Sequence, residues 1–326
     1  MNARPIGIRI PAAGLKHVRA ATGAVVLATT ALALVHVAFG QEKRPFWLDG
    51  DNIPPFYEKR AAGQNIAPAF EGWEQNPDGT FNMVFGYFNR NWEEQPDVPI
   101  GPDNNVEPGG PDQGQPTHFF PRRNKLVFRV RVPKDFGDKD LVWTLTVNGK
   151  TERAYATLKP DYIIEKLILQ TIAAVTIRGV RDDAVILANM PPVVQLEGDS
   201  RRTVKVGEPL RLNALVTDDG IYKPLPLSKG PNFSDNTAMG LRVAWFVYRG
   251  PASAVRFSPE QFKVYQDKQL GGNSPWSPGW APPPIPPDGK FPVTVTFGAP
   301  GTFVVRVLAS DGGLETAKDV TVTVRP

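Results

Sequence analysis

Apolar and polar residues alternate along much of this chain, which is the pattern of strands that bury one face. Between residues 69 and 158, turn sequences separate such stretches. NPDG at 76–79 lies between strands predicted at 69–75 and 80–88, and Asn148-Gly149 predicts a two-residue hairpin into a strand at 151–158. The inward positions predicted for these strands are Phe81, Met83, Phe85 and Tyr87, then Leu126, Phe128, Val130 and Val132, then Leu141, Trp143, Leu145 and Val147.

The same alternation returns after residue 189. Strands in series with one apolar face predict two-sheet sandwiches, and Trp245 is expected to be a large core side chain. The inward positions predicted here are Leu210, Leu212, Ala214 and Val216; Leu241, Val243, Trp245 and Val247; Val293, Val295 and Phe297; Phe303, Val305, Val307 and Ala309; and Val320, Val322 and Val324.

We therefore predict an all-β protein with two tandem immunoglobulin-like β-sandwich domains, preceded by one N-terminal transmembrane helix. The predicted division is 1–40 for the cytoplasmic N-terminus and membrane segment, 41–160 for the first sandwich with an extended arm, 161–190 for a connector, and 191–326 for the second sandwich, with a Pro/Trp-rich insertion at 265–290. The connector fits either a helix capped by Asp161 or a strand.

The second half also carries a family resemblance. TVKVGEPLRLNALVTDDG, LRVAWFVYRGP and APGTFVVRVLASDG (299–312) resemble PKD-like domains, immunoglobulin-like sandwiches common in bacterial surface and periplasmic proteins, with Phe303 where the family often has tyrosine. The resemblance covers 189–326 apart from two insertions, and it implies an adhesive, spacing or partner-binding module. The first domain, with its GPDNN…GQPTHFFPRR loop, resembles uncharacterised bacterial secreted β-rich proteins.

The first 40 residues differ from the rest in charge and hydropathy. Residues 1–19 hold basic residues and no acid, and residues 20–39 carry no formal charge. A helix of that length spans roughly 30 Å, about the hydrocarbon thickness of a bilayer. We expect a single-pass signal-anchor in a bacterial inner membrane, with the bulk of the chain periplasmic. The alternative is secretion after cleavage at Gly40-Gln41, behind a small-x-small sequence.

Beyond this segment the chain is formally neutral. Residues 41–326 hold 33 basic and 33 acidic residues, which argues against nucleic-acid binding. The absence of cysteine excludes disulfides, thiolate catalysis and cysteine-based zinc sites. His118 is the only histidine beyond residue 40, so a serine-type triad would need it, although a packed histidine closing the 100–123 loop is the simpler interpretation. No spacing suggests a carboxylate acid/base pair, and we predict no enzymatic activity and no cofactor other than calcium.

Calcium is the one metal that the sequence suggests. Asp218, Asp219 and Asp311 lie in loops that the family topology would bring to one end of the sandwich, and carboxylate oxygens are calcium ligands. Asp103, Asn104, Asn105, Glu107 and Asp112 in the 100–123 loop are further oxygen ligands. The alternative for both sets is turn chemistry, in which Asx side chains accept hydrogen bonds from nearby backbone.

Several features predict partner surfaces. Trp276, Trp280 and Pro283 lie in the stiff insertion, and Phe46 and Trp47 lie in the aromatic arm. The insertion either contacts a partner or folds back over the sandwich as a lid. In the membrane segment, Ala20, Ala24, Ala28 and Ala31 recur at helical spacing and would form a smooth face for packing against another membrane helix.

These features predict a non-enzymatic, membrane-anchored periplasmic accessory subunit that binds the outer face of a bacterial membrane protein complex. A respiratory or photosynthetic assembly would fit this architecture, although no residue identifies it. The alternative is a secreted or cell-surface glycan- or peptide-binding module, with Trp276 and Trp280 as a sugar platform.

Overall fold

The computed structural model describes residues 59–172, 183–224, 239–267, 269, 271–277 and 279–326. The predicted membrane segment with its four alanines, and the arm residues Phe46 and Trp47, lie outside this described part. Within the described part, no helix combines the length and the apolar character that crossing a bilayer requires.

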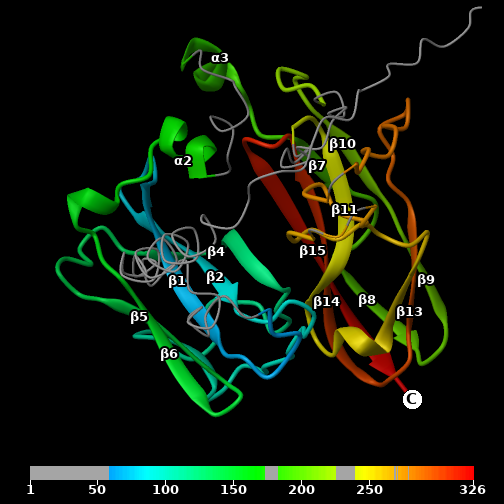
Figure 1. Ribbon diagram of the computed structural model, residues 1–326, viewed down its shortest axis with the longest axis horizontal. Helices are drawn as coiled ribbons and strands as arrows, with labels where there is room; N and C mark the ends of the chain where they lie inside the picture. Colours follow the sequence, from blue (N-terminus) through cyan, green and yellow to red (C-terminus); the bar gives the residue numbers. More distant parts are fainter. Residues whose placement is uncertain (1–58, 173–182, 225–238, 268, 270, 278) are drawn as a thin grey trace, which may run out of the picture. The chain divides into compact units, whose positions relative to one another are not determined.

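The first sandwich consists of two three-stranded sheets, in the orders β1-β2-β4 and β3-β5-β6. All of its strand pairs are antiparallel. The predicted hairpin turn at Asn148-Gly149 joins β5 to β6, and both turn residues have the positive φ of a primed turn. The strands, which except for β3 are labelled in Figure 1, are β1 (Ile66–Gln75), β2 (Phe81–Asn89), β3 (Asn104–Glu107), β4 (Arg122–Val132), β5 (Leu141–Val147) and β6 (Lys150–Ala156).

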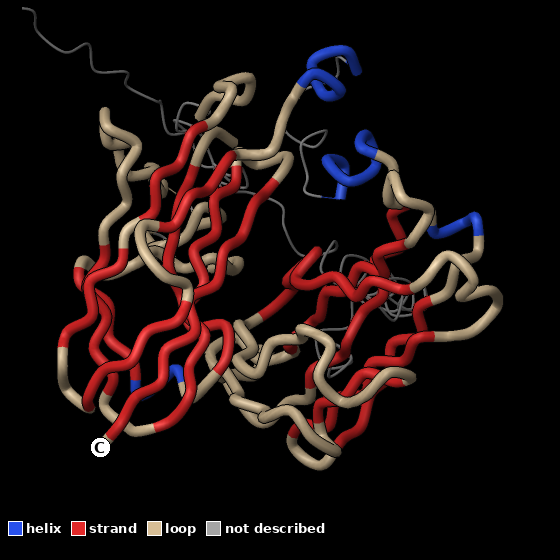
Figure 2. The backbone as a smooth tube through the Cα atoms, turned by 180° about the vertical axis from the view of Figure 1, so that it is seen from behind, coloured by secondary structure: helices blue, strands red, loops and turns tan. Residues whose placement is uncertain are grey.

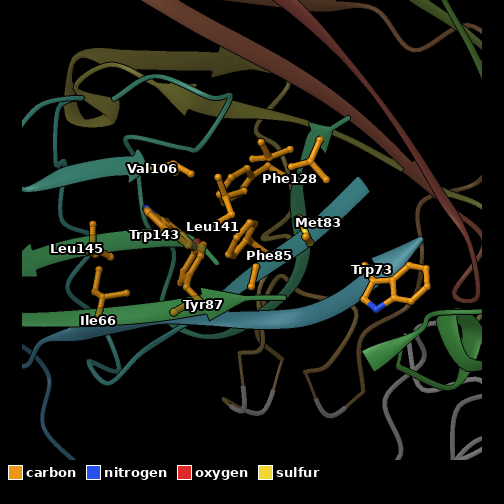
Figure 3. Close-up of a cluster of buried hydrophobic side chains, with 14 of the residues drawn as sticks. Ile66, Trp73, Met83, Phe85, Tyr87, Val106, Phe128, Leu141, Trp143 and Leu145 are labelled. Carbon is orange, nitrogen blue, oxygen red and sulfur yellow. The ribbon is translucent and has the colours of Figure 1, made fainter. Parts of the chain in front are cut away.

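The core of the first sandwich lies between these sheets and is rich in aromatic rings (Figure 3). Trp143 on β5 is fully buried, and its ring meets Phe85 of β2 edge-on, with centroids 6.0 Å apart. The indole Nε1 donates to Oδ1 of the buried Asn104 over 3.0 Å. Because the ring packing and the satisfied indole both favour one arrangement, this core fixes the two sheets against each other.

One strand departs from the predicted alternation. The pairing of β2 with β4 shifts register between Phe85 and Tyr87. Leu126 lies in the resulting bulge with a φ of 57°, and it packs with Val84 and Ile164 in a small separate cluster. The prediction that Leu126 belongs to the main core is therefore wrong, because β4 has three residues (125–127) where β2 has one, and this bulge places Leu126 in the separate cluster.

The connector is helical where the structure describes it. The 3-10 helix η4 (Pro160–Tyr162) comes first, followed by α2 (Lys166–Ile172) and α3 (Asp183–Ala188). The helical alternative is thus the correct one, but α2 does not begin at a cap on Asp161. The backbone N–H of Ile164 donates to the carbonyl of Trp73 over 2.8 Å, which holds this part of the connector against β1 and moves the helix start to Lys166.

The second sandwich has a four-stranded sheet in the order β11-β14-β15-β8, a three-stranded sheet in the order β12-β13-β9, and the pair β10-β7. Its described strand pairs are antiparallel except for β15 and β8. Strands dominate the described part, and helices are short (Figure 2). The elements are β7 (Val193–Leu196), β8 (Arg201–Lys205), β9 (Pro209–Leu212), β10 (Ala214–Thr217), β11 (Arg242–Arg249), η6 (Ala252–Ala254), β12 (Val255–Ser258), β13 (Val293–Phe297), β14 (Gly301–Ser310) and β15 (Glu315–Arg325).

The core of the second sandwich follows the predicted pattern closely. Trp245 is 2% exposed, and its indole Nε1 donates to the carbonyl of Phe291 over 3.0 Å. The all-β, immunoglobulin-like prediction is therefore confirmed for the described part. The predicted inward side chains that are buried are Leu212, Ala214 and Val216, Val243, Trp245 and Val247, Val293, Val295 and Phe297, Phe303, Val305, Val307 and Ala309, and Val320, Val322 and Val324.

Candidate functional site

Strand β11 is buried on both faces, although a strand in a two-sheet sandwich needs only one buried face. Val243 and Trp245 enter the sandwich core. The alternate side chains Arg242, Phe246 and Tyr248 lie on the outer face of the sheet and line a cavity of about 430 Å³. Something must therefore cover this outer face.

The cover comes from the first sandwich and from the insertion. Strand β4 contributes Lys125, Val127 and Arg129, and the loop before it contributes His118 and Phe120. The segment between β12 and the insertion adds Phe262, and the insertion adds the half-buried Trp276, among others. We call this space, lined by β11, β14 and β15 on one side and by β4 and the 116–120 segment on the other, the inter-sandwich cavity.

Hydrogen bonds hold the two walls together beside the cavity. The backbone N–H groups of Thr117 and His118 donate to the carbonyl of Tyr248, over 3.2 and 3.3 Å. The Tyr248 hydroxyl donates back to the carbonyl of Gly114 over 2.6 Å. Arg306 on β14 donates to the carbonyl of Val127 over 3.2 Å. These hydrogen bonds join segments that are far apart in sequence, so they fix the two walls of the cavity relative to each other.

Ring contacts continue the same junction. Phe120 packs edge-on against Phe246, with centroids 5.4 Å apart, and stacks with Tyr265 at 5.3 Å. The guanidinium carbon of Arg306 lies 3.3 Å from the centroid of the Tyr248 ring. Burial disfavours the Arg306 charge, but hydrogen bonding to Asp319 and contact with Tyr248 outweigh it and keep the Arg306 pKa above its usual value. Burial raises the pKa of Tyr248 to about 12, so its hydroxyl stays protonated and donating.

Arg242 is the unusual side chain of the cavity wall. It is only 7% exposed, and its Nη2 donates to Ser310 Oγ over 3.0 Å. Its guanidinium carbon lies 5.7 Å from the centroid of the Trp276 ring, within the range of a cation–π contact. Its Nε has no hydrogen-bond partner among the described residues. Burial lowers the Arg242 pKa to about 10, so the group is still charged at neutral pH.

Glu315 is the acidic group of this wall. It lies near Arg129, Arg306 and Arg242, whose charges favour its ionised form, yet burial outweighs them and raises the Glu315 pKa. Among the described residues, no cation lies within 4.0 Å of its carboxylate. The cavity thus combines apolar rings with an excess of positive charge, and it holds a buried arginine whose hydrogen-bonding capacity is not used up.

The structure separates the predicted partner residues. Trp276 lines the inter-sandwich cavity. Trp280 is 7% exposed and meets Phe262 edge-on, with centroids 5.5 Å apart, so it matches the lid alternative and not an exposed contact. Pro283 is exposed on the surface of the insertion. Packing against Phe262 removes the apolar surface of the Trp280 ring from water, which favours its inward position.

The carboxylates predicted as calcium ligands accept backbone hydrogen bonds. Asp311 Oδ1 accepts from the backbone N–H groups of Gly313 and Leu314, over 2.6 and 2.7 Å. In the turn at 218–221, Asp218 accepts from Gly220 N over 3.0 Å and Asp219 Oδ1 accepts from Ile221 N over 2.9 Å. Asp219 Oδ2 also accepts from the distant Met190 N over 2.7 Å. Within the described residues, no group of acidic or histidine side chains is arranged to hold a metal ion. The turn-chemistry alternative is the one that these contacts match.

A second polar network surrounds Asp311. This carboxylate is fully buried, and its Oδ2 accepts from Asn189 Nδ2 over 2.9 Å. Asn189 Nδ2 also donates to Gln170 Oε1 over 3.1 Å, and the Tyr222 hydroxyl donates to the same oxygen over 2.7 Å. Burial raises the pKa of Asp311 more than these hydrogen bonds lower it. The network ties the connector to the second sandwich.

His118 has a structural environment. Its Nδ1 lies 2.8 Å from Asp97 Oδ1, and its Nε2 lies 3.0 Å from Gln95 Oε1. Both ring nitrogens therefore meet side chains, and neither one meets a hydroxyl nucleophile. Gln95 in turn donates to the Tyr265 hydroxyl over 3.1 Å, so His118 braces the loop against the second sandwich, as the packed interpretation expects.

The predicted site residues did not include Arg242, Phe120 or Tyr248. A signal for Arg242 is present in the sequence, because it interrupts the otherwise apolar strand LRVAWFVY with a charge. An arginine within such a strand is almost never buried unless it has a partner. The sequence gives no comparable signal for Phe120 or Tyr248, because their neighbours come from a different sandwich.

No protein-family model matches this chain, and no curated protein matches it either. Solved structures that it resembles include domains 4 and 5 of the S-layer protein SbsC, at 9% identity and a TM-score of 0.23, covering 58% of this chain and 66% of that one. Immunoglobulin domains 1–4 of Sidekick-1 match at 12% identity and a TM-score of 0.22, covering 80% and 48%. A conjugative transposon lipoprotein from Bacteroides eggerthii matches at 12% identity and a TM-score of 0.24, covering 40% and 95%.

These matches are weak, and this chain spans less than two thirds of the first two fragments. The immunoglobulin-like description of the sandwiches rests on their own strand pairing.

Proposed function

We propose that this chain is a non-enzymatic accessory subunit, anchored in a bacterial inner membrane by residues 20–39, which binds the outer face of a membrane protein complex. The inter-sandwich cavity is its contact site. The observation that supports this most directly is the composition of the cavity wall, where Arg242, Trp276 and Tyr248 lie together. Tryptophan, tyrosine and arginine are the residues that most often dominate binding energy at protein interfaces.

The alternative of a glycan-binding module has less support. A sugar platform needs exposed aromatic faces, and the proposal for it depended on Trp276 and Trp280 together. Trp280 is 7% exposed and covered by Phe262, so it presents no free face. A peptide-binding module would use the same cavity, and it differs from the first proposal only in whether the chain stays in the membrane.

The membrane anchor is supported by sequence alone. Residues 20–39 are uncharged and follow a basic segment, and Ala20, Ala24, Ala28 and Ala31 would give their helix a packing face. Intact mass and N-terminal sequencing of the protein from its native membranes test the anchor. An intact Gly40-Gln41 bond is expected, and a mature chain beginning at Gln41 would contradict anchorage.

Purification of the full chain from native membranes in a mild detergent tests the partner. We expect co-purification of membrane proteins at fixed stoichiometry. Arg242→Gln should lower their recovery by about tenfold or more, as for an interface hot spot. Arg201→Gln, an exposed arginine of the same sheet, is the matched control and should leave recovery unchanged. A monodisperse monomer, or equal loss in both variants, would contradict the proposal.

A further inference from the structure

Arg242 carries unused hydrogen-bonding capacity inside the inter-sandwich cavity. It is 7% exposed, its Nη2 is bonded to Ser310 Oγ, and its Nε has no partner among the described residues. A buried charged donor without a partner is costly, so a protein retains one when something else completes it. A guanidinium is a planar fork of donors that matches a carboxylate, which accepts two parallel hydrogen bonds.

The other arginines of the wall are already committed to carboxylates. Arg123 Nη2 lies 2.7 Å from Glu71, Arg129 Nε lies 2.9 Å from Glu74, and Arg306 Nε lies 2.7 Å from Asp319. Arg242 has no such partner, because among the described residues no carboxylate lies within 4.0 Å of it. Glu315, the acid of the same wall, faces Arg129 and Arg306 as well as Arg242. Asp311 and Glu315 act on Arg242 through their charges, but no carboxylate of the described residues is hydrogen-bonded to its guanidinium.

Apolar side chains share the cavity wall with Arg242. Trp276, Phe246 and Phe262 line the cavity with it, and Leu308 lies on the neighbouring strand β14. A volume of about 430 Å³ is within the range of roughly 300–1,000 Å³ that ligand sites occupy, and it is far larger than one water molecule. A bare inorganic anion would leave most of these rings uncovered. The complementary ligand has one carboxylate next to an apolar group.

We infer that the inter-sandwich cavity binds a peptide segment of a partner protein that presents a carboxylate beside an aromatic or aliphatic side chain, with the carboxylate on Arg242 and the apolar group against Trp276. This inference rests on the proposed function, since it takes the ligand to be part of a partner protein. The inference specifies the chemical groups that the partner presents, and it identifies Arg242 as the residue that binds the carboxylate.

The probe is the tripeptide Gly-Gly-Phe with a free C-terminal carboxylate, compared with the same peptide as its C-terminal amide. Binding to the full chain in detergent is measured by calorimetry and by tryptophan fluorescence, because Trp276 lies in the cavity. We expect the acid to bind about tenfold or more tightly than the amide, since hydrogen bonds to charged groups are the stronger ones. Equal binding of acid and amide, or binding of neither, would overturn the inference.

Arg242→Gln separates recognition by Arg242 from general attraction. We expect it to abolish the preference for the acid, while the matched control Arg201→Gln preserves it. Arg242→Lys keeps the charge without the fork and should retain part of the preference, which serves as the second variant if Arg242→Gln does not fold. Circular dichroism checks folding of each variant. A preference that survives in both Arg242 variants would overturn the assignment.

A last arm distinguishes a partner segment from a free organic acid. If 3-phenylpropionate binds and the peptide does not, the cavity takes a small acid and the partner part of the inference is wrong. Failure of the proposed function has a different signature. If the peptide binds through Arg242 but no membrane protein co-purifies, the binding site is supported and the accessory role is contradicted. If membrane proteins co-purify but the peptide does not bind, the accessory role is supported and the proposed ligand chemistry is contradicted.

Discussion

Arg249 of the second sandwich and Asp112 of the first form a two-point ion pair. Nη1 lies 3.0 Å from Asp112 Oδ2, and Nη2 lies 2.7 Å from Oδ1, while Nε donates to the carbonyl of Gln115 over 2.8 Å. All three nitrogen atoms of the Arg249 guanidinium thus donate hydrogen bonds to Asp112 or Gln115. The hydrogen bonding to Arg249 lowers the pKa of Asp112, so the carboxylate stays ionised well into the acid range.

Breaking this pair should loosen the junction between the sandwiches. We expect Arg249→Met to lower the free energy of unfolding by about 1–2 kcal/mol, because the Gln115 carbonyl loses a charged donor. Hydrogen exchange at Thr117 and Gly250, whose N–H groups take part in the junction, should become faster. Arg256→Met, an exposed arginine on β12, is the matched control. Unchanged exchange would mean that the other hydrogen bonds and the ring contacts hold the junction without this ion pair.

The buried carboxylate of Asp311 should make stability depend on pH with a defined sign. Burial raises its pKa in the folded protein above the ordinary value of 3.8. Between these two pKa values the folded state holds a proton that the unfolded state has released, so stability falls as pH rises through that window. Asp311→Asn mimics the protonated acid and should reduce this fall.

Urea unfolding between about pH 3 and pH 7 checks this, with the difference between wild type and Asp311→Asn plotted against pH. Asp199→Asn, at a carboxyl whose side chain is 94% exposed, is the control. Since Asp218 and Glu315 also have raised pKa values, some pH dependence should remain in Asp311→Asn. A stability difference that is constant across the range would contradict the prediction.

Gly86 occupies a position with no room for a side chain. A Cβ built there would lie 2.5 Å from the carbonyl oxygen of Asn124 and would also collide with the Glu71 carboxylate. We expect Gly86→Ala to cost about 1–3 kcal/mol, as overpacking does, because the β2–β4 pairing must shift. In Gly298→Ala the nearest atom would be 3.5 Å away, so the control should change stability little. Thermal melting of both variants tests this prediction, and an equal change in melting temperature in the two variants would contradict it.

The two tryptophans of the insertion should respond differently to truncation. Trp280→Ala removes a buried ring and should destabilise the protein by about 3–5 kcal/mol. Trp276→Ala removes a half-buried ring over Arg242, so a smaller loss is expected. Only the second variant should weaken binding at the inter-sandwich cavity while the protein remains folded. Equal stability losses would mean that Trp276 is as firmly packed as Trp280.

Local sequence determined most of the strands and both cores. The alternation that placed Trp143 and Trp245 inside is a property of consecutive residues, and Asn148-Gly149 needs no distant partner to form its turn. Each of these features depends on the two-residue period of a strand or on the φ preference of a turn residue. Local physics therefore suffices for them.

Tertiary structure decided the departures and the candidate site. The bulge that turns Leu126 away depends on how β4 pairs with β2, and the burial of Trp280 depends on Phe262. The cavity around Arg242 exists because the 112–120 loop and β4 cover the outer face of β11. Contacts between residues more than a hundred positions apart leave no periodic trace in the sequence, which is why the strands could be predicted and their junction could not.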